Sequence, residues 1–455
     1  MTPAPASAVP AAPAAPAALR GHIVTFRGNP FLMPPHDALV DEPDGLVIIT
    51  DGRITHAGAY GETIRHLPAG VPVADYRGCL ISAGFVDTHV HYPQLPMIAA
   101  YGEQLLEWLE RYTFPTERRF ADETYATTIA RQFLHGLLRC GTTTAAVYCT
   151  VHPQSVDAFF GQSTRLGTLM VAGKVLMDRN APDYLRDTAQ RGYDESRRLI
   201  DQWHGRNRQH YAVTPRFAPT STPEQLELAG ALLKGDDTLF MQTHLAENRA
   251  EVAWVADLYP DSRSYLDVYD RAGLVRPRSV MGHGIYVDEH DLCRCHESGC
   301  ALAHCPTSNL FLGSGAFRLF DVMDAKRPVR TGLGTDVGAG TSLSHLQSMN
   351  EAYKIAQMTG KRLHPVQAFW LATRGGAEAL HLDDRIGAIA PGMDADLCIL
   401  DPCATPLQAL RAQMCDSTAD ILFTLMMLGD DRSIRATWVG GRLVHDRDSG
   451  DMAGM

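Results

Sequence analysis

Two histidines separated by one residue end an apolar segment of the chain, "FVDTHVH" (residues 85–91). Because successive side chains of a β-strand point to opposite faces, His89 and His91 are expected to point the same way. Two imidazoles on one face form half of a metal site. A single His-x-His pair is also typical of an ordinary strand end near solvent, so the metal-site hypothesis needs further ligands elsewhere in the chain.

Further reactive residues stand near the carboxyl ends of other candidate strands. His244 ends one such strand, His283 lies on the next, and Asp336 ends the last. Taken singly, His244 is typical of a buried core histidine and Asp336 of a turn among glycines. Three imidazoles and one carboxylate together suit Zn²⁺ or Fe²⁺, with one coordination position left for water. This candidate ligand set is His89, His91, His244 and Asp336.

A carboxylate follows one of the proposed ligands. A metal bound by this set lowers the pKa of a water ligand to about 7, and hydrolysis then needs a group that takes up the proton and passes it on. "HLAE" (residues 244–247) places Glu247 just after His244, which makes Glu247 the acid/base candidate. The alternative is a glutamate at a helix N-terminus, where the helix dipole favours negative charge.

Lys174 in "VAGKVLMD" leaves a second kind of metal site open. A strand-borne lysine in a barrel can be carbamylated and bridge two metal ions. The spacing of His244 and Glu247 suits a one-metal site, which favours an ordinary ion-paired lysine. Metal content separates the two hypotheses, because two equivalents per chain would contradict the one-metal site.

These residues need a scaffold that brings strand ends together. Between about residues 84 and 384 apolar, strand-like runs alternate with helix-like stretches such as 124–140 and 348–360. Eight strands separated by helices in about 300 residues are typical of an α/β fold with a TIM-like (β/α)₈ barrel, whose sites form at the carboxyl ends of the strands. The candidate strands are 84–91, 142–150, 169–178, 211–219, 239–247, 279–287, 300–308 and 329–338.

Both ends of the chain are rich in short strand-like runs. Hairpin turns are predicted at Asp51-Gly52 and Gly440-Gly441. We expect residues 20–83 and 385–455 to combine in one small β-sandwich domain, with the metal-dependent catalytic barrel at 84–384. Residues 1–19 repeat alanine and proline and are expected to form a disordered tail, since the prolines would break a signal helix.

Composition excludes several classes of partner. The formal net charge of −11 argues against nucleic acid, which requires a concentrated basic face. The run "ERRF" (residues 117–120) is interpreted as solvated helix surface. "ILFTLMML" (residues 421–428) is far too short for a membrane span, so no membrane role is expected. The ten cysteines include no C-x-x-C pair, which favours reduced thiols in a cytoplasmic protein.

From about Gly21 to Val444 the chain resembles the amidohydrolase superfamily and, more closely, its guanine deaminases. His-x-His with a distant aspartate marks only the superfamily, whereas "LLEWLERYTFPTE" and "TPRFAPTS" are narrower signals. "THLAEN", "HCPTSNLFLGSG" and "GLGTDVGAGTSLSHLQSMNEAYK" match as well. The resemblance implies a barrel that bears a β domain from both termini. It also implies one zinc per chain, held by His89, His91, His244 and Asp336.

The resemblance implies roles for the other candidates. Glu247 would shuttle the proton, and His283 in "MGHGIY" would contact the hydrolytic water and the substrate. Many relatives have a cysteine near this histidine, a departure that we do not expect to abolish activity. Purine recognition would fall to three residues: a guanidinium that donates to the carbonyl oxygen, an aromatic ring that stacks, and an amide that both donates and accepts. These are Arg216, Phe217 and Gln94.

The reaction expected from the resemblance is zinc-dependent hydrolysis of guanine at C2 to xanthine and ammonia, a step of purine catabolism. Asp336 and His283 would stabilise the tetrahedral centre. The partners would be guanine and water, and we expect a homodimer, since barrels of this kind often associate. Alternatives are a related deaminase acting on a pterin, a triazine or an adenine derivative, or a non-catalytic barrel scaffold. The H-x-E and P-C-x-x-C pattern of a second class of zinc deaminase is absent.

Overall fold

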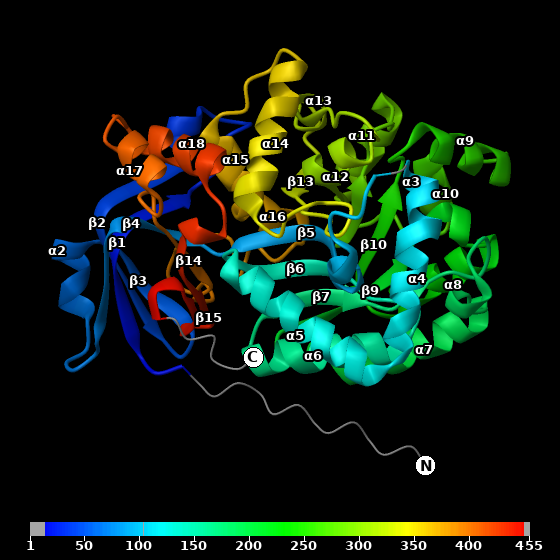
Figure 1. Cartoon of the computed structure of the whole chain (residues 1–455), viewed down its shortest axis with the longest axis horizontal. Helices are drawn as coiled ribbons and strands as arrows, with labels where there is room; N and C mark the ends of the chain where they lie inside the picture. The colour runs from blue at the N-terminus through cyan, green and yellow to red at the C-terminus, as the bar shows by residue number, and fades with distance from the viewer. Residues whose placement is uncertain (1–13, 103, 450–455) are drawn as a thin grey trace. The chain divides into compact units, whose positions relative to one another are not determined.

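The computed structural model describes residues 14–102 and 104–449, which Figure 1 shows as a ribbon. The described chain forms two compact units. The first comprises Thr88–Leu134 and Ala145–Thr341, and the second comprises residues 14–87, 135–144 and 342–449. The predicted domain ranges 20–83, 84–384 and 385–455 stay a prediction, because the compact units reflect how closely residues pack and do not define domain boundaries.

The predicted barrel of parallel strands is confirmed. Its strands neighbour one another in the order β13-β12-β11-β10-β9-β7-β6-β5, and the short β8 pairs with β9. Every residue of β5, β6 and β7 is buried, as expected for parallel strands covered on both faces. The bounds are β5 Phe85–His91, β6 Thr142–Tyr148, β7 Leu169–Gly173, β8 Val175–Leu176, β9 Gln209–Pro215, β10 Phe240–Leu245, β11 Ser279–His283, β12 Ala301–His304 and β13 Arg330–Leu333.

Helices follow the barrel strands and cover them. Helices α6, α7 and α8 pack along β7 and β9, as the green and cyan part of Figure 1 shows. The bounds in this region are α5 Glu123–Arg139, α6 Pro153–Leu166, η5 Asp183–Leu185, α7 Ala189–Trp203, η6 Ala218–Thr220, α8 Pro223–Gly235, α9 Arg249–Leu258, α10 Tyr265–Arg271, α11 Glu289–Ser298, α12 Pro306–Phe311 and α13 Leu319–Val322. The helix predicted at 124–140 is confirmed as α5.

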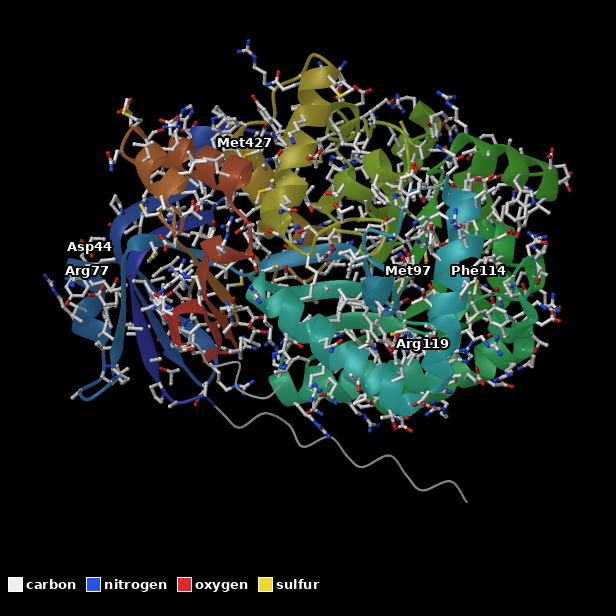
Figure 2. All side chains as sticks on the ribbon, in the orientation of Figure 1. Asp44, Arg77, Met97, Phe114, Arg119 and Met427 are labelled. Atoms are coloured by element: carbon white, nitrogen blue, oxygen red, sulfur yellow. The ribbon has the colours of Figure 1, made fainter. Side chains whose placement is uncertain are left out.

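A run of helical turns follows β5 and its 3₁₀ turn η2 (Tyr92–Met97). It consists of α3 (Leu105–Trp108), the π-helical turn η3 (Leu109–Thr113), α4 (Phe114–Glu117) and η4 (Arg118–Ala121). Arg119 is exposed, and Figure 2 labels it on this run together with the buried Phe114. The residues at the two ends of "ERRF", Glu117 and Phe120, are only 1% and 0% exposed. The interpretation of this stretch as solvated surface is therefore wrong for these two, because residues three apart share one helix face.

The second unit contains one seven-stranded sheet built from both ends of the described chain, as predicted. Its strand order is β16-β15-β14-β4-β1-β2-β3, in which β1 and β4 run parallel and the other neighbours antiparallel. The bounds are β1 Ala17–Phe26, β2 Leu39–Thr50, β3 Arg53–Ala59, β4 Val73–Ala83, β14 Leu397–Leu400, β15 Ile434–Val439 and β16 Arg442–Asp446.

Both predicted hairpin turns are confirmed in this sheet. Asp51-Gly52 joins β2 to β3, and Gly440-Gly441 joins β15 to β16. All four residues have positive φ, the backbone that twisted two-residue hairpins require. The helices of this unit are α1 Pro35–Ala38, α2 Tyr60–Thr63, η1 Ile64–His66, α14 His345–Met358, α15 Pro365–Ala372, α16 Arg374–Ala379, α17 Pro406–Ala412, α18 Thr418–Leu428, η7 Asp431–Ser433 and η8 Arg447–Ser449.

The predicted disordered tail of residues 1–19 extends too far along the chain, because its last three residues belong to a strand. Strand β1 begins at Ala17, and both Ala18 and Leu19 are 0% exposed. Leu19 pairs with Val47 of β2 and Ala74 of β4, so sheet pairing on two sides overrides the local alanine and proline composition. Residues 14–16 precede this strand without regular secondary structure, and residues 1–13 of the predicted tail lie outside the described residues. In 14–102 and 104–449, every helix is too short or too polar to cross a membrane.

Candidate active site

The predicted metal ligands lie together at the carboxyl ends of barrel strands. His89 and His91 end β5, His244 lies near the end of β10, and Asp336 follows β13. The His91 Nε2 atom lies 3.3 Å from His89 Nε2 and 3.2 Å from His244 Nε2. Asp336 Oδ1 lies 3.2 Å from Nε2 of both His89 and His91. One ligand atom from each of the four residues falls within 4.8 Å of the others.

The protonation of these imidazoles fits a metal ion. His244 Nδ1 lies 2.7 Å from the backbone carbonyl oxygen of Arg216, which can only accept, so Nδ1 carries the hydrogen and Nε2 presents a lone pair. Burial lowers the pKa of His91 to about 3, and burial with the neighbouring imidazoles lowers the pKa of His244 well below its usual value. Neutral imidazoles whose lone pairs converge beside a carboxylate repel one another unless a cation lies between them. The donor set therefore suits a metal ion.

A second group of ligand-type residues overlaps the first. It consists of His89, His283, Cys305 and Asp336, again with one ligand atom each within 4.8 Å of the others. The Cys305 thiol donates to the carbonyl oxygen of Ala303 at 3.5 Å. A protonated thiol in such a contact is a weaker ligand than the lone pair of His244. Both groups share His89 and Asp336, so the two candidate positions overlap.

The backbone around this cluster is held in uncommon conformations. Ala246, His283 and Asp336 have φ values of 47°, 69° and 50°, in the left-handed region that non-glycine residues rarely adopt. The Asp336 N–H donates to the carbonyl oxygen of His89 at 2.9 Å, which ties β5 to the loop after β13. A Cβ at Gly340 would lie 1.7 Å from the Thr335 carbonyl oxygen, so this tight loop requires glycine there. Strained residues that cluster in this way are typical of functional sites.

The acid/base candidate Glu247 is buried beside the cluster. Its Oε2 atom lies 3.4 Å from His283 Nε2, and its Oε1 atom accepts a hydrogen bond from the Ser314 hydroxyl at 3.0 Å. Burial and the charge of Asp336 raise the pKa of Glu247 to about 8. The His283 Nδ1–H donates to Asn309 Oδ1 at 2.9 Å, which points His283 Nε2 at both Glu247 and Asp336. Glu247 can therefore hold or release a proton near neutral pH.

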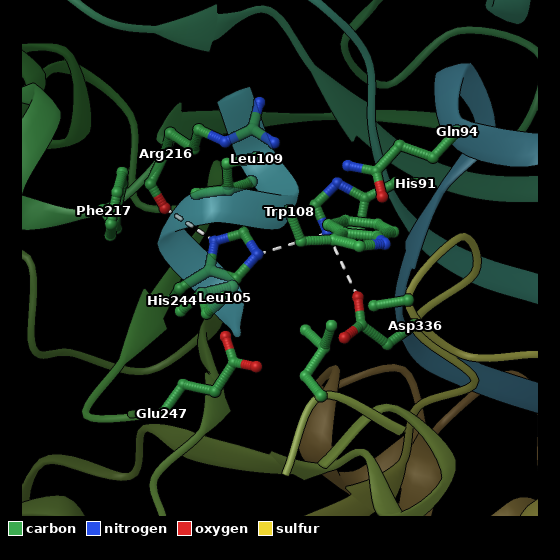
Figure 3. A pocket seen from close by; sticks show the side chains of 12 residues that line it. His91, Gln94, Leu105, Trp108, Leu109, Arg216, Phe217, His244, Glu247 and Asp336 are labelled. Atoms are coloured by element: carbon green, nitrogen blue, oxygen red, sulfur yellow. Dashed lines mark hydrogen bonds and ion pairs between the residues drawn. The ribbon is translucent and has the colours of Figure 1, made fainter. Parts of the chain in front are cut away.

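A cavity opens beside the cluster, and Figure 3 shows its lining. One part of the lining is apolar and partly aromatic, and the other is polar. Arg216 and Gln94 face the cavity opposite Glu247, and Phe217 lies next to Arg216 (Figure 3). The lining residues are His91, Gln94, Leu105, Trp108, Leu109, Arg216, Phe217, His244, Glu247, Leu312, Asp336 and Ala339. An apolar cavity with a few convergent polar groups is the usual form of a small-molecule site.

The family follows from comparison with known proteins. Residues 80–444 match the sequence model of the amidohydrolase family. The chain belongs to the amidohydrolase family. Guanine deaminase of Escherichia coli is 51% identical to it over 405 residues, which cover 89% of this chain and 92% of the relative.

Solved structures of amidohydrolases agree with this assignment. The structure of E. coli guanine deaminase superimposes with a TM-score of 0.92 and 49% identity, covering 95% of this chain and 100% of the other. A guanine deaminase from C. acetobutylicum, solved with guanine bound in its active site, gives a TM-score of 0.85 and 27% identity, with 95% and 100% covered. The similarity thus extends over both compact units.

Three residues of this amidohydrolase site were missed from the sequence. These residues are Glu117, Ser314 and Glu251, and all three are buried. Glu117 contacts Arg216, Ser314 contacts the carboxylate of Glu247, and Glu251 contacts the backbone of Glu247. Their signals were weak because glutamate and serine on loops and short helices are mostly solvated. Glu117 and Ser314 lie inside "LLEWLERYTFPTE" and "HCPTSNLFLGSG", the stretches that resembled guanine deaminases, and that resemblance was the available signal.

Lys174 does not line the cavity beside the metal cluster. Its ammonium group is buried and forms an ion pair with Asp187, and it lies 3.5 Å from a carboxylate oxygen of Glu195. Asp187 also accepts a hydrogen bond from Gln225 at 3.2 Å. The ion-paired lysine favoured from the sequence is therefore present.

Proposed function

We propose that this amidohydrolase is a guanine deaminase, which hydrolyses guanine to xanthine and ammonia in purine catabolism. One observation carries the proposal: a single cavity adjoins the cluster of four ligand groups and is lined by a buried acid/base and a hydrogen-bonding wall suited to a flat base. The guanine deaminases of E. coli and C. acetobutylicum support this choice of substrate.

We infer that the metal is one Zn²⁺ per chain. It would be held by the three imidazoles and one carboxylate of His89, His91, His244 and Asp336. When bound, such an ion lowers the pKa of a water molecule and so supplies the nucleophile. The backbone carbonyl of Arg216 orients the ring of His244 for this role, as outer hydrogen bonds do in other metal sites. Mass spectrometry of the native protein gives the identity and number of the ions.

Glu247 carries the proton in the proposed reaction. Its carboxylate accepts a proton from the attacking water and delivers it to N3 of the guanine ring, while C2 becomes tetrahedral. The proton of the new C2 hydroxyl then passes to the amino group, and the C2–N bond breaks to release ammonia as the C2 carbonyl forms. A pKa raised to about 8 suits a group that must both gain and lose a proton near neutral pH. His283 and Asp336 stabilise the tetrahedral centre, since His283 Nε2 lies 3.4 Å from the Glu247 carboxylate and 3.7 Å from that of Asp336.

The base is held by the opposite wall of the cavity. Arg216 donates to the carbonyl oxygen of guanine, Gln94 hydrogen-bonds the ring edge, and Phe217 packs against the ring face. The ring centroid of Phe217 lies 6.5 Å from that of His244. A base that stacks on Phe217 would therefore lie close to this proposed metal ligand. A site that hydrogen-bonds these groups discriminates against analogues that lack them.

Two further proposals concern the whole protein. We expect it to be cytoplasmic, which the ten free cysteines of the described chain support, because thiols stay reduced in that compartment. We also expect a homodimer, as symmetric dimers are the commonest oligomers. Light scattering on the purified protein tests the dimer, and a molar mass near one chain would contradict it.

The reaction is tested by mixing the purified protein, with its metal content measured, with guanine. Xanthine is followed by absorbance and ammonia by a coupled assay. Equal amounts of xanthine and ammonia with about one zinc per chain are expected. No turnover by the fully metallated protein would contradict the proposed substrate, and the same assay with pterin, triazine and adenine derivatives would then find the related activity. Inactivity with the whole panel would favour a non-catalytic barrel.

A further inference from the structure

Glu117 lies behind the polar wall of the cavity and contacts both residues that form it. Arg216 Nη1 donates to Glu117 Oε1 at 3.0 Å and to Oε2 at 2.8 Å. Gln94 Nε2 donates to Oε1 at 3.2 Å. The three residues are only 1–3% exposed, and Glu117 itself does not line the cavity. One buried carboxylate therefore holds the two groups that would meet the base.

The contacts of Gln94 determine which way its amide points. The backbone N–H of Gly338 donates to Gln94 Oε1 at 3.2 Å, on the other side of the amide from Glu117. A backbone N–H can only donate and a carboxylate can only accept, so both neighbours require the same orientation. The amide cannot turn over to exchange its N–H₂ and carbonyl groups without losing both contacts. Gln94 consequently keeps an N–H for a ligand.

Arg216 is fixed in the same way. Its Nη1 group is committed to Glu117, and a guanidinium has no acceptor, so the rest of the group can only donate. The negative charge of Glu117 balances the positive charge of Arg216, since both are buried and 2.8 Å apart. The wall thus offers N–H donors without a net charge. Such a wall fits a neutral ring that carries an oxo group and disfavours one that carries an amino group at that position.

We propose that Glu117 is the positioning residue that sets the choice between oxopurines and aminopurines. By holding Arg216 and Gln94 as donors, it makes the cavity accept a carbonyl oxygen at purine position 6 and reject an amino group there. This inference rests on the proposed function and deepens it. An amino group facing these donors would leave buried N–H groups without acceptors, a loss that accounts for strong discrimination in other enzymes.

The test compares guanine with 2,6-diaminopurine, which has the same amino group at C2 but an amino group in place of the oxygen. We expect wild-type kcat/KM to favour guanine at least 100-fold. Glu117→Gln should reduce that preference at least tenfold, mainly through a higher KM for guanine, because one amide oxygen cannot replace two carboxylate oxygens. Equal losses for both purines would show a merely structural role and overturn the proposal.

Two variants complete this test. Glu117→Asp keeps a carboxylate and should retain the preference for guanine even where its overall rate is lower. Loss of the preference to the same degree in Glu117→Asp and Glu117→Gln would contradict the inference. Glu110→Gln changes an exposed glutamate of the same helical run and should match the wild type. Metal content is measured for each variant.

Binding separates the failure of this inference from the failure of the proposed function. Hypoxanthine and adenine differ in the oxo or amino group at position 6 and in the hydrogen that N1 carries in the oxo form, and both lack the C2 amino group that would be hydrolysed. Calorimetry on the wild type should give at least tenfold tighter binding of hypoxanthine, and Glu117→Gln should lose that difference. If the wild type shows this binding preference but does not deaminate guanine, the result would refute the proposed substrate and leave the role of Glu117 standing. Equal wild-type binding of the two purines would refute the role of Glu117.

Discussion

The buried carboxylate of Glu251 accepts a hydrogen bond from the backbone N–H of Glu247 at 2.9 Å. Glu251 therefore holds the backbone of the acid/base candidate in place. The same oxygen accepts the N–H of Asn248 at 3.0 Å, and the second oxygen accepts the Tyr265 hydroxyl at 2.7 Å. Asn248 caps helix α9, with Glu251 as the reciprocal partner of this capping box. An ordinary helix-capping device thus fixes the loop from which the acid/base candidate projects.

This arrangement predicts how stability depends on pH. Burial and the neighbouring Glu247 raise the pKa of Glu251 to about 7 from an ordinary value of 4.5. The folded protein then binds this proton more tightly than the unfolded chain, and stability falls as the pH rises from about 4.5 to about 7, by on the order of 3 kcal/mol. Glu251→Gln keeps an acceptor for the two backbone N–H groups but has no proton to lose. Urea unfolding should show that the stability of the variant, relative to that of the wild type, is greater at pH 7.5 than at pH 5. An equal difference in the free energy of unfolding at both pH values would contradict this.

Ser314→Ala should shift the pH dependence of catalysis. The Ser314 hydroxyl donates to Glu247 and stabilises its charged form, so its removal raises the pKa of Glu247 further. Because Glu247 must be ionised to accept the proton, kcat/KM rises with pH through this pKa, and the rise should move to higher pH in the variant. A pH–rate profile should show a several-fold loss at low pH that recovers at high pH. A loss by one factor at every pH would indicate a general structural defect.

Removal of the metal should destabilise the protein as well as inactivate it. Without a cation, the lone pairs of His91 and His244 face each other at 3.2 Å. A ligand that binds only the folded state stabilises it by about 4 kcal/mol at a concentration of 1,000 times its Kd. A chelator should therefore lower the Tm, and added Zn²⁺ should restore it. His244→Ala is the matched control, since a chelator should change its Tm little, and an equal drop in both proteins would contradict the assigned ligand.

Much of the candidate site could be predicted because the candidate ligands stand at or near strand ends. His89, His91 and His244 are buried or partly buried at the carboxyl ends of β5 and β10, where a parallel barrel collects side chains from distant parts of the chain. The alternation of strands and helices predicts the barrel. The chemical types of the ligands then predict the metal site without knowledge of their distances.

Other features depend on contacts that no local pattern contains. Glu117 is buried because Arg216, 99 residues later in the chain, balances its charge, whereas its neighbour Arg119 is exposed as expected. Gln94 is oriented by Gly338, which lies 244 residues away. Strand β1 likewise extends to Ala17 only because β2 lies alongside it. Local composition describes the preference of a segment, and tertiary pairing overrides it in these places.

The most direct test of the proposed chemistry is Glu247→Gln. The substitution keeps the size of the side chain and an oxygen that accepts the Ser314 hydroxyl, but the amide cannot carry the proton. We expect kcat to fall by about 10²–10⁴ while zinc content and KM for guanine change little, because the metal ligands and the Arg216 wall are untouched. Stopped-flow absorbance gives kcat, and Glu227→Gln, an exposed change on α8, provides the control. Near-normal turnover in Glu247→Gln would exclude Glu247 as the proton carrier and leave His283, 3.4 Å away, as the next residue to change.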